Sequence, residues 1–149
     1  MAVIFKVADK TDIPEILKMM ISFNSIYKYP FDEKLSKGNL LRFLRNKELG
    51  RIWLIFEEEI IVGYVVLTFG FSFEYKGRDA FIDELFLKEA YRNKGIGKKT
   101  MEFLEKQASQ LDLGAIHLEV ERNNDKAAKL YTQQGYKDYD RDMLTKKFK

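Results

Sequence analysis

Apolar residues in the first third of the chain repeat first with the spacing of a strand and then with that of a helix. Residues 3–7 predict a short strand. A helix is expected to begin at Thr11 or Asp12, because one face then collects the apolar side chains Ile13, Ile16, Leu17 and Met20. Residues 24–30 interrupt this pattern, and Asp32 can cap a second helix.

The middle of the chain changes to strand-like runs of β-branched and aromatic residues. Residues 51–56, 60–73 and 80–87 each predict a strand. The turns between them are too short for crossover connections, so the three strands are expected to be antiparallel.

The last third alternates between helices and strands. An amphipathic helix is expected from Gly97 to about residue 111, a strand over residues 115–121, and a short helix over residues 124–134 with Gly135 after it. Tyr136 and residues 143–148 predict two closing strands. The pattern indicates a mixed α/β (α+β) fold, and since no linker or repeat interrupts it, residues 1–149 are expected to form one domain.

Composition removes several classes of function. The 149 residues include no cysteine and one histidine, which excludes thiolate zinc sites, cysteine nucleophiles and multi-histidine metal sites. The net charge of +3 is too small to favour nucleic-acid binding. No run is long and apolar enough to span a bilayer, and no signal peptide is visible at the start. We therefore expect a cytoplasmic protein that binds no metal, nucleic acid or membrane.

Residues 87–98 join an apolar strand to an amphipathic helix through a basic loop that contains Gly95 and Gly97. The start of such a helix binds anions through free backbone N–H groups. The loop fails the dinucleotide pattern because Thr100 replaces its third glycine. It also fails the Walker pattern, because Lys99 stands where Ser or Thr should follow. A glycine-containing turn with a solvated basic face is the alternative to an anion site.

Two motifs resemble the GNAT superfamily of N-acetyltransferases: an acid-bearing strand over residues 82–87 followed by Arg92-Asn93-Lys94-Gly95-Ile96-Gly97, and residues 118–131 with Gly135-Tyr136. The resemblance covers the whole chain and is closest to the diamine and polyamine acetyltransferases and their bacterial relatives. It implies a mostly antiparallel sheet, splayed by a bulge, with flanking helices. It also implies acetyl-CoA as co-substrate, bound by the backbone of Leu85, Phe86 and Leu87, by the loop Arg92, Asn93, Lys94, Gly95, Ile96, Gly97 and Lys98, and by Asn124 and Ala127.

Acetyl transfer to an amine needs a base, because an alkylammonium with a pKa of about 10.4 has no free lone pair. Asp83 and Glu84 are the candidates, and on a regular strand only one of them can face the chemistry. We favour Glu84 for its longer side chain and keep Asp83 open. The alternative is a pair in which one carboxylate is structural and the other binds a cationic amine.

The resemblance implies that Tyr131 protonates the departing thiolate; the alternative is a core tyrosine. Tyr27, Glu74 and Glu119 are the substrate-binding candidates, whereas His117 is interpreted as a sheet-face residue. The leading function is acetyl-CoA-dependent transfer to a small primary amine, a polyamine or an amino-acid-like amine, by direct attack in a ternary complex. The alternatives are a protein lysine or N-terminal acetyltransferase and a non-catalytic CoA sensor. A homodimer is expected through residues 69–75 and the closing strands.

Overall fold

The computed structural model describes residues 2–149, which divide into two compact units, Met1–Glu119 and Val120–Lys149. The first unit contains a five-stranded sheet with the order β1-β2-β3-β4-β5. Its elements are β1 (Val3–Val7), α1 (Ile13–Ile26), α2 (Glu33–Arg45), β2 (Gly50–Glu57), β3 (Ile60–Ser72), β4 (Gly77–Leu87), α3 (Ile96–Gln110) and β5 (Ala115–His117), with single 3₁₀ turns at Lys10–Asp12 and Glu89–Tyr91. The mixed α/β prediction is confirmed.

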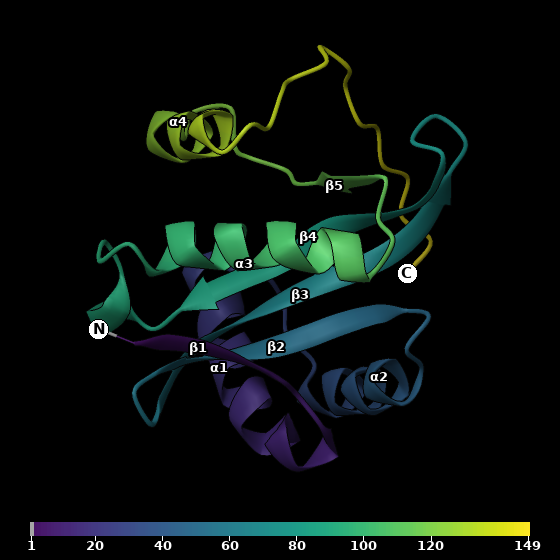
Figure 1. Ribbon diagram of the computed structural model, residues 1–149. Helices are drawn as coiled ribbons and strands as arrows, with labels where there is room; N and C mark the ends of the chain where they lie inside the picture. Colours follow the sequence, from purple (N-terminus) through teal and green to yellow (C-terminus); the bar gives the residue numbers. More distant parts are fainter. Residues whose placement is uncertain (1) are drawn as a thin grey trace. The chain divides into compact units, whose positions relative to one another are not determined.

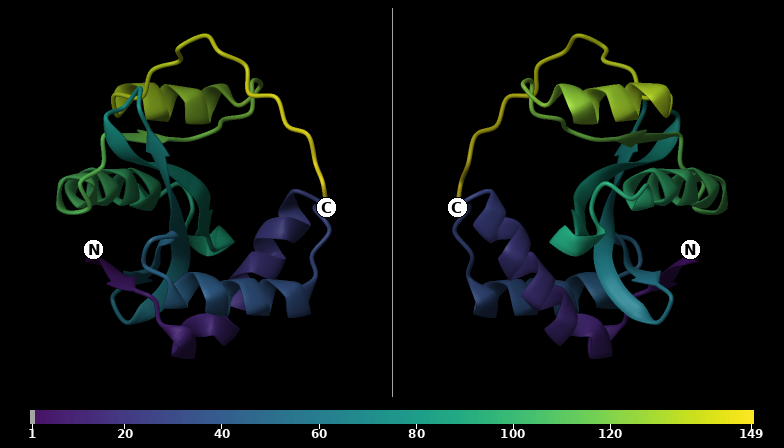
Figure 2. Two further views of the ribbon diagram at one scale, coloured as in Figure 1. Left: turned by 90° about the vertical axis from the view of Figure 1, so that its right-hand side faces the viewer. Right: turned by 90° about the vertical axis from the view of Figure 1, so that its left-hand side faces the viewer.

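The helices of the first unit cover both faces of the sheet (Figures 1 and 2). Alternate side chains of the strands pack against α1 and α2 in one apolar cluster, which includes Ile52, Leu54, Tyr64, Val66 and Phe86. The side chains between them face α3, where Ile55, Val62 and Ile96 are buried together. Because neighbouring residues of a strand point to opposite faces, each strand supplies both layers.

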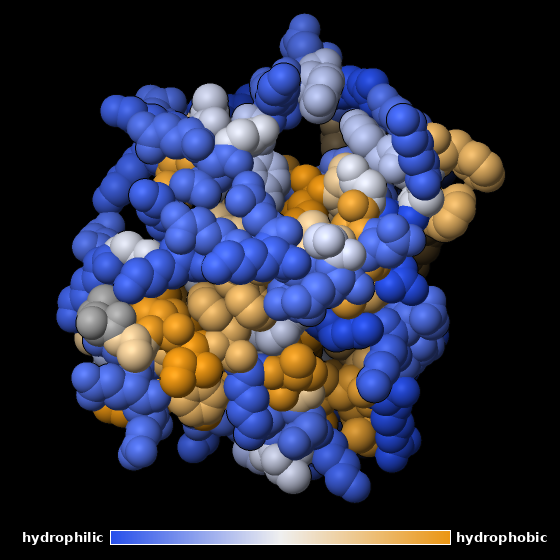
Figure 3. All heavy atoms as spheres, viewed as in Figure 1, coloured by the Kyte–Doolittle hydropathy of each residue, from blue (hydrophilic) through white to orange (hydrophobic). Residues whose placement is uncertain are grey.

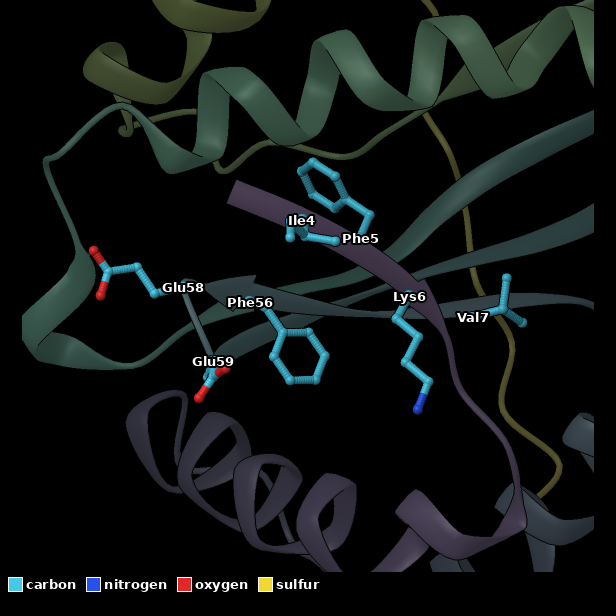
Figure 4. A pocket seen from close by; sticks show the side chains of 7 residues that line it. All are labelled: Ile4, Phe5, Lys6, Val7, Phe56, Glu58 and Glu59. Atoms are coloured by element: carbon cyan, nitrogen blue, oxygen red, sulfur yellow. The ribbon is translucent and has the colours of Figure 1, made fainter. Parts of the chain in front are cut away.

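β1 forms one edge of the sheet, and a hollow lies along it. Figure 4 shows Phe5 pointing toward α3, and Lys6 and Phe56 pointing to the other side. The Phe5 ring stacks on Phe103 of α3 with a centroid separation of 4.2 Å. In Figure 3 apolar residues gather over this edge, below the hydrophilic outer side of α3. Ile4 and Val7 remain exposed there.

The helix starts follow the sequence signals. Asp32 caps α2 by accepting a hydrogen bond from the N–H of Leu35, 3.0 Å from Oδ1, as expected. α1 begins after Asp12, which lies at the N-cap position. Among residues 2–149, no helix has both the length and the apolar character needed to cross a lipid bilayer.

Only the first part of the expected strand over residues 115–121 forms. β5 pairs with β4 in parallel through Ala115, Ile116 and His117, and residues 118–121 leave the ladder. β4 and β5 thus separate after a short paired stretch, as the resemblance to the GNAT superfamily implied. His117 donates to or accepts from Asp79, with 2.9 Å between Nε2 and Oδ2, and this contact ties the two strands together at the end of their pairing.

The second unit contains α4 (Asp125–Gln133) and an extended segment after it. The expected strands at Tyr136 and at residues 143–148 are wrong, because the structure assigns no strand to described residues after His117. Leu144 and Phe148 are exposed, and Asp140 has a φ of 57°, which interrupts an extended backbone. Residue type favours a strand, but a strand forms only where a neighbouring strand offers hydrogen-bonding partners.

Gly63 and Gly38 are a matched pair for testing the sheet. A Cβ on Gly63 of β3 would lie 2.1 Å from the backbone oxygen of Phe86, whereas a Cβ on Gly38 of α2 meets nothing within 4 Å. We expect Gly63→Ala to lower the melting temperature strongly, since β3 and β4 must move apart. Gly38→Ala should stabilise the protein by about 0.5–1 kcal/mol, because it replaces a helical glycine. Equal melting temperatures for the two variants would contradict the close β3–β4 approach.

Candidate active site

A β-bulge at Asp83 interrupts the pairing of β4 with β3. Glu84 pairs with Val66 and Ile82 pairs with Leu67, so Asp83 is an extra residue in β4 without a partner in β3. Val66 faces α1 and α2, whereas Leu67, its neighbour, faces the other side. Directly opposite residues of paired strands point to the same face of the sheet. Glu84 therefore points with Val66 toward α1 and α2, whereas Ile82 points with Leu67 to the opposite face.

The bulge brings both candidate carboxylates to one side of the sheet. Asp83 and Glu84 both line a cavity of about 590 Å³. The expectation that only one of them can face the chemistry is therefore wrong, because it assumed a regular strand. The other walls come from α1, α2 and the segment between them, and from β2 and β3, and include Met20, Phe31, Leu35, Phe43, Ile52 and Val66.

Tyr64 holds Glu84 in place. Its phenolic O–H donates to Oε1 of Glu84 at 2.6 Å, and the Tyr64 ring is fully buried beside Phe86. Burial and the negative charge of Glu84 raise the pKa of the phenol, so Tyr64 stays a protonated donor. Sequence reasoning missed Tyr64, which lies 20 residues from Glu84 and belongs to an apolar run.

The carboxyl groups of Asp83 and Glu84 both have raised pKa values. Burial raises the pKa of Glu84, the Tyr64 hydrogen bond opposes this shift, and the charge of Asp83 adds to it. Asp83 is exposed as a whole residue, but its carboxyl group is partly desolvated, and this desolvation raises its pKa. The negative charge of Glu119 raises the pKa of Asp83 further. Carboxylates with raised pKa values are better proton acceptors than ordinary surface carboxylates.

The loop between β4 and α3 presents cations and backbone donors. Arg92 donates from Nε to the carbonyl oxygen of Leu87 at 2.8 Å, and its guanidinium lies over the Phe86 ring. Gly95, with a φ of 82°, is the N-cap of α3 and offers no side-chain acceptor. The first N–H groups of a helix have no partner within it, so those of Ile96, Gly97 and Lys98 can bind an anion.

This loop has the room that a phosphate group needs. A Cβ on Gly97 would meet no atom within 4 Å, so open space lies over the first turn of α3. Ile96 is buried and anchors that turn, whereas Lys94 and Lys98 are exposed. The donor set of amides and cations fits the pyrophosphate of acetyl-CoA.

The strand before the loop has an open edge. β4 pairs with β3 as far as Leu87, but its other edge is paired with β5 only from Asp79 to Phe81. Among the described residues, no strand continues beside Leu85, Phe86 and Leu87 on that edge. An extended molecule with amide groups can pair there as an added strand would.

The second unit carries the remaining candidates. Asn124 caps α4 by accepting a hydrogen bond from the N–H of Ala127, 3.1 Å from Oδ1. Tyr131 lies on the same helix, half-buried, with its ring 6.2 Å from that of Tyr136. The observed cap confirms the expected start of this helix, and the roles of Asn124, Ala127 and Tyr131 in chemistry stay predictions.

The substrate-binding candidates are dispersed. Tyr27 follows α1 and packs on Phe23 and Tyr29, and it does not line the cavity; Glu74 lies in the β3–β4 turn. Glu119 is exposed and acts on Asp83 through its charge. Asn24, Asp32 and Asn39 also line the cavity but were not among the expected site residues. Asp32 was expected only as a helix cap, and Asn24 and Asn39 give no distinct sequence signal. Among residues 2–149, no cluster of three His, Asp or Glu side chains is suited to a metal ion.

Known proteins are similar to this chain in sequence and in fold. The acetyltransferase (GNAT) family model matches residues 16–136. An uncharacterized N-acetyltransferase of Archaeoglobus fulgidus is 26% identical over 129 residues, which cover 85% of this chain and 88% of that protein. The thialysine N-ε-acetyltransferase of Bos taurus is 31% identical over 78 residues, 52% of this chain and 45% of that protein.

Solved structures of other proteins have a similar fold. An integron cassette protein from the mobile metagenome of Cole Harbour Salt Marsh has a TM-score of 0.86 and 28% identity, covering 97% of this chain and 90% of that one. A protein of Clostridium acetobutylicum described as a predicted acetyltransferase, solved with acetyl-CoA, has a TM-score of 0.79 and 18% identity, and the match covers 97% of this chain and 96% of that one. With the family model matching most of its length, the chain belongs to the GNAT family and is an acetyltransferase.

Proposed function

We propose that this protein transfers the acetyl group of acetyl-CoA to the primary amine of a small molecule by direct attack, with residues 1–149 acting as one domain. The observation that carries the proposal is the cavity lined by both Asp83 and Glu84, together with the hydrogen bond that Tyr64 donates to Glu84. The bovine relative, whose name assigns it to the amine of thialysine, supports an amine acceptor of the polyamine or amino-acid-like kind.

Glu84 is the proposed base. An acceptor amine enters the cavity as an ammonium and loses a proton to the Glu84 carboxylate, which frees the nitrogen lone pair. Tyr64 keeps this carboxylate oriented and ionised, because its hydrogen bond favours the charged form. Asp83, one residue away on the same side of the sheet, attracts the ammonium.

The residues around the β4–α3 loop fit acetyl-CoA, whose thioester supplies the activated acetyl group. The proposed roles are pyrophosphate binding by Arg92, Asn93, Lys94, Gly95, Ile96, Gly97 and Lys98, pairing with the pantetheine arm by Leu85, Phe86 and Leu87, and further contacts from Asn124 and Ala127. The amine nitrogen bonds to the acetyl carbon as the carbon–sulfur bond breaks, and the acetylated nitrogen then releases its remaining surplus proton to solvent to give the neutral amide. Tyr131 is proposed to give its phenolic proton to the sulfur.

Acetyl-CoA should stabilise the protein against heat while ATP and NAD have little effect. A ligand at a hundred times its Kd adds about 2.7 kcal/mol. Gly97→Val should remove this stabilisation, because a branched side chain would occupy the space over the first turn of α3. Gly38→Val is the control, with the same change on a helix distant from the loop in sequence. An equal thermal shift with ATP would reduce the loop to a general anion site.

The pH dependence of kcat/KM should identify the base. Activity needs ionised Glu84, so it should fall as the pH drops through the raised pKa of this residue. Tyr64→Phe removes the hydrogen bond that lowers the pKa of Glu84, so the loss of activity should begin at a higher pH. Asp83→Asn removes a charge that raises it and should move the fall to lower pH. Loss of activity at all pH values in Asp83→Asn, with Glu84→Gln active, would make Asp83 the base.

Tyr131→Phe should lower turnover by about 10²–10⁴-fold, the usual contribution of a general acid, and leave acetyl-CoA affinity within a few-fold. The variant keeps the aromatic ring and loses only the hydroxyl. Tyr136→Phe is the matched control on the neighbouring ring and should retain activity. Single-turnover measurements isolate the chemical step. An unchanged rate for that step would show that the sulfur takes its proton from elsewhere.

We propose a homodimer as well, now supported by the β3–β4 hairpin alone because the closing strands do not form. Phe71 and Phe73 are 72% and 93% exposed. Exposed aromatic side chains this close together are typical of a surface that another protein covers. Sedimentation at micromolar concentration should give the dimer mass, and Phe73→Asp should give the monomer mass. A wild-type protein that sediments as a monomer would contradict the proposal.

A further inference from the structure

We propose that the hydrogen bond between Asp79 and His117 is a positioning contact for acetyl-CoA. It fixes the point at which β5 leaves β4, and so keeps the edge of β4 at residues 85–87 open for the pantetheine arm. This inference rests on the proposed function, and it assigns a role to two side chains that the proposed chemistry does not use. The pairing of β4 with β5 and the contacts around His117 carry it.

The paired stretch of β4 and β5 is too short to hold its own register. Among the described residues, the pairing runs only from Asp79 with Ala115 to Phe81 with His117. Successive side chains of a strand alternate between faces, so a slip of two residues would keep every side chain on its own face. Such a slip of β5 toward the end of β4 would bring the residues after His117 beside residues 85–87. A contact outside the backbone ladder must therefore select the observed register.

The side chain of His117 is held by three neighbouring residues. Its Nε2 atom lies 2.9 Å from Oδ2 of Asp79. An ionised carboxylate only accepts hydrogen bonds, so the ring nitrogen is the donor. The imidazole also contacts the rings of Tyr75 and Phe81, each with a centroid separation of 4.9 Å. The side chains of His117 and Asp79 are only 23% and 13% exposed, so water competes weakly for their hydrogen bond.

The backbone around Asp79 leaves room for its carboxylate and holds the start of β5. Asp79 pairs with Gly70 of β3, and a Cβ on Gly70 would lie 2.8 Å from Oδ1 of Asp79. The carboxylate therefore occupies space that a side chain at this position of β3 would fill. Just before β5, the N–H of Gly114 donates to the carbonyl oxygen of Arg78 at 2.8 Å. β5 is thus attached to β4 at both ends of a short ladder.

The side-chain bond distinguishes the observed register from the slipped one. Asp79 lies two residues before Phe81, the partner of His117, so the imidazole reaches it diagonally across the ladder. After a slip of two residues, the same diagonal neighbour of His117 would be Phe81, whose side chain accepts no hydrogen bond. The backbone ladder makes no such distinction, because each of these residues offers one N–H and one C=O. The Asp79–His117 bond therefore favours the register in which residues 85–87 keep a free edge.

The test compares the Kd values of two ligands, measured by titration calorimetry below the melting transition of each variant. One ligand is acetyl-CoA, and the other is adenosine 3′-phosphate 5′-diphosphate, the part of CoA without the pantetheine arm. Asp79→Ala should raise the Kd of acetyl-CoA about tenfold, the scale of one hydrogen bond to a charged group. It should leave the Kd of the nucleotide nearly unchanged, because the β4–α3 loop lies beyond Leu87 at the other end of the strand.

Three further variants separate a positioning role from a general loss of stability. In Asp79→Asn the side-chain oxygen still accepts a hydrogen bond from His117, so acetyl-CoA should bind nearly as tightly as to the wild type. His117→Phe keeps an aromatic ring and removes the donor, so it should weaken acetyl-CoA binding as Asp79→Ala does. Glu48→Ala is the matched control, since it removes an ion pair with Arg78 of the same strand, 2.8 Å long, and should change neither Kd.

Several outcomes would overturn the inference. An unchanged Kd of acetyl-CoA in folded Asp79→Ala would contradict it, as would Asp79→Asn behaving like Asp79→Ala. Equal weakening of acetyl-CoA and of the nucleotide would indicate a general loss of structure and would also contradict it. If Asp79→Ala does not fold, His117→Phe decides by the same comparison. Each of these results leaves the proposed function standing as long as the wild type binds acetyl-CoA; a wild type without acetyl-CoA binding would remove both.

Discussion

The extra residue in β4 is the constraint on which the rest of the site depends. Because Asp83 has no partner in β3, the strand changes face between Ile82 and Glu84. The buried Tyr64 of the neighbouring strand then meets the Glu84 carboxylate at 2.6 Å, and Phe86 continues the core on the same side. A regular strand would turn Glu84 toward α3 and leave Tyr64 as a buried phenol without an acceptor, which is costly in a protein interior.

β4 also connects the two halves of the proposed reaction. Its edge toward β3 is paired as far as Leu87. Its other edge loses β5 after Phe81, which leaves backbone groups open just where the strand leads into the basic loop. One strand can thus present carboxylates on its α1–α2 face and backbone groups at its free edge, and a reacting amine and a thioester are proposed to meet there.

Two places in the first unit carry opposite charge, the β4–α3 loop and the cavity lined by Asp83 and Glu84. The α3 start carries exposed lysines and the backbone N–H groups of a first helical turn, which suit phosphates. The cavity is lined by carboxylates, and no Lys, Arg or His is among its described lining residues. Separation of this kind favours binding of an anionic co-substrate and a cationic acceptor at different positions, so each is drawn to its own site.

The sequence by itself determined the order of elements through β4, the caps at Asp32 and Asn124, and the glycine-containing start of α3, because these follow from local periodicity and local hydrogen bonds. It also indicated the acidic pair and the basic loop, since both are contiguous. The bulge, the Tyr64–Glu84 bond and the cavity at Asp32 depend on pairing between residues distant in the chain, and no local pattern encodes a register shift. The closing strands failed for the same reason: residues 143–148 have strand-like composition, but only the tertiary structure decides whether a partner edge is present.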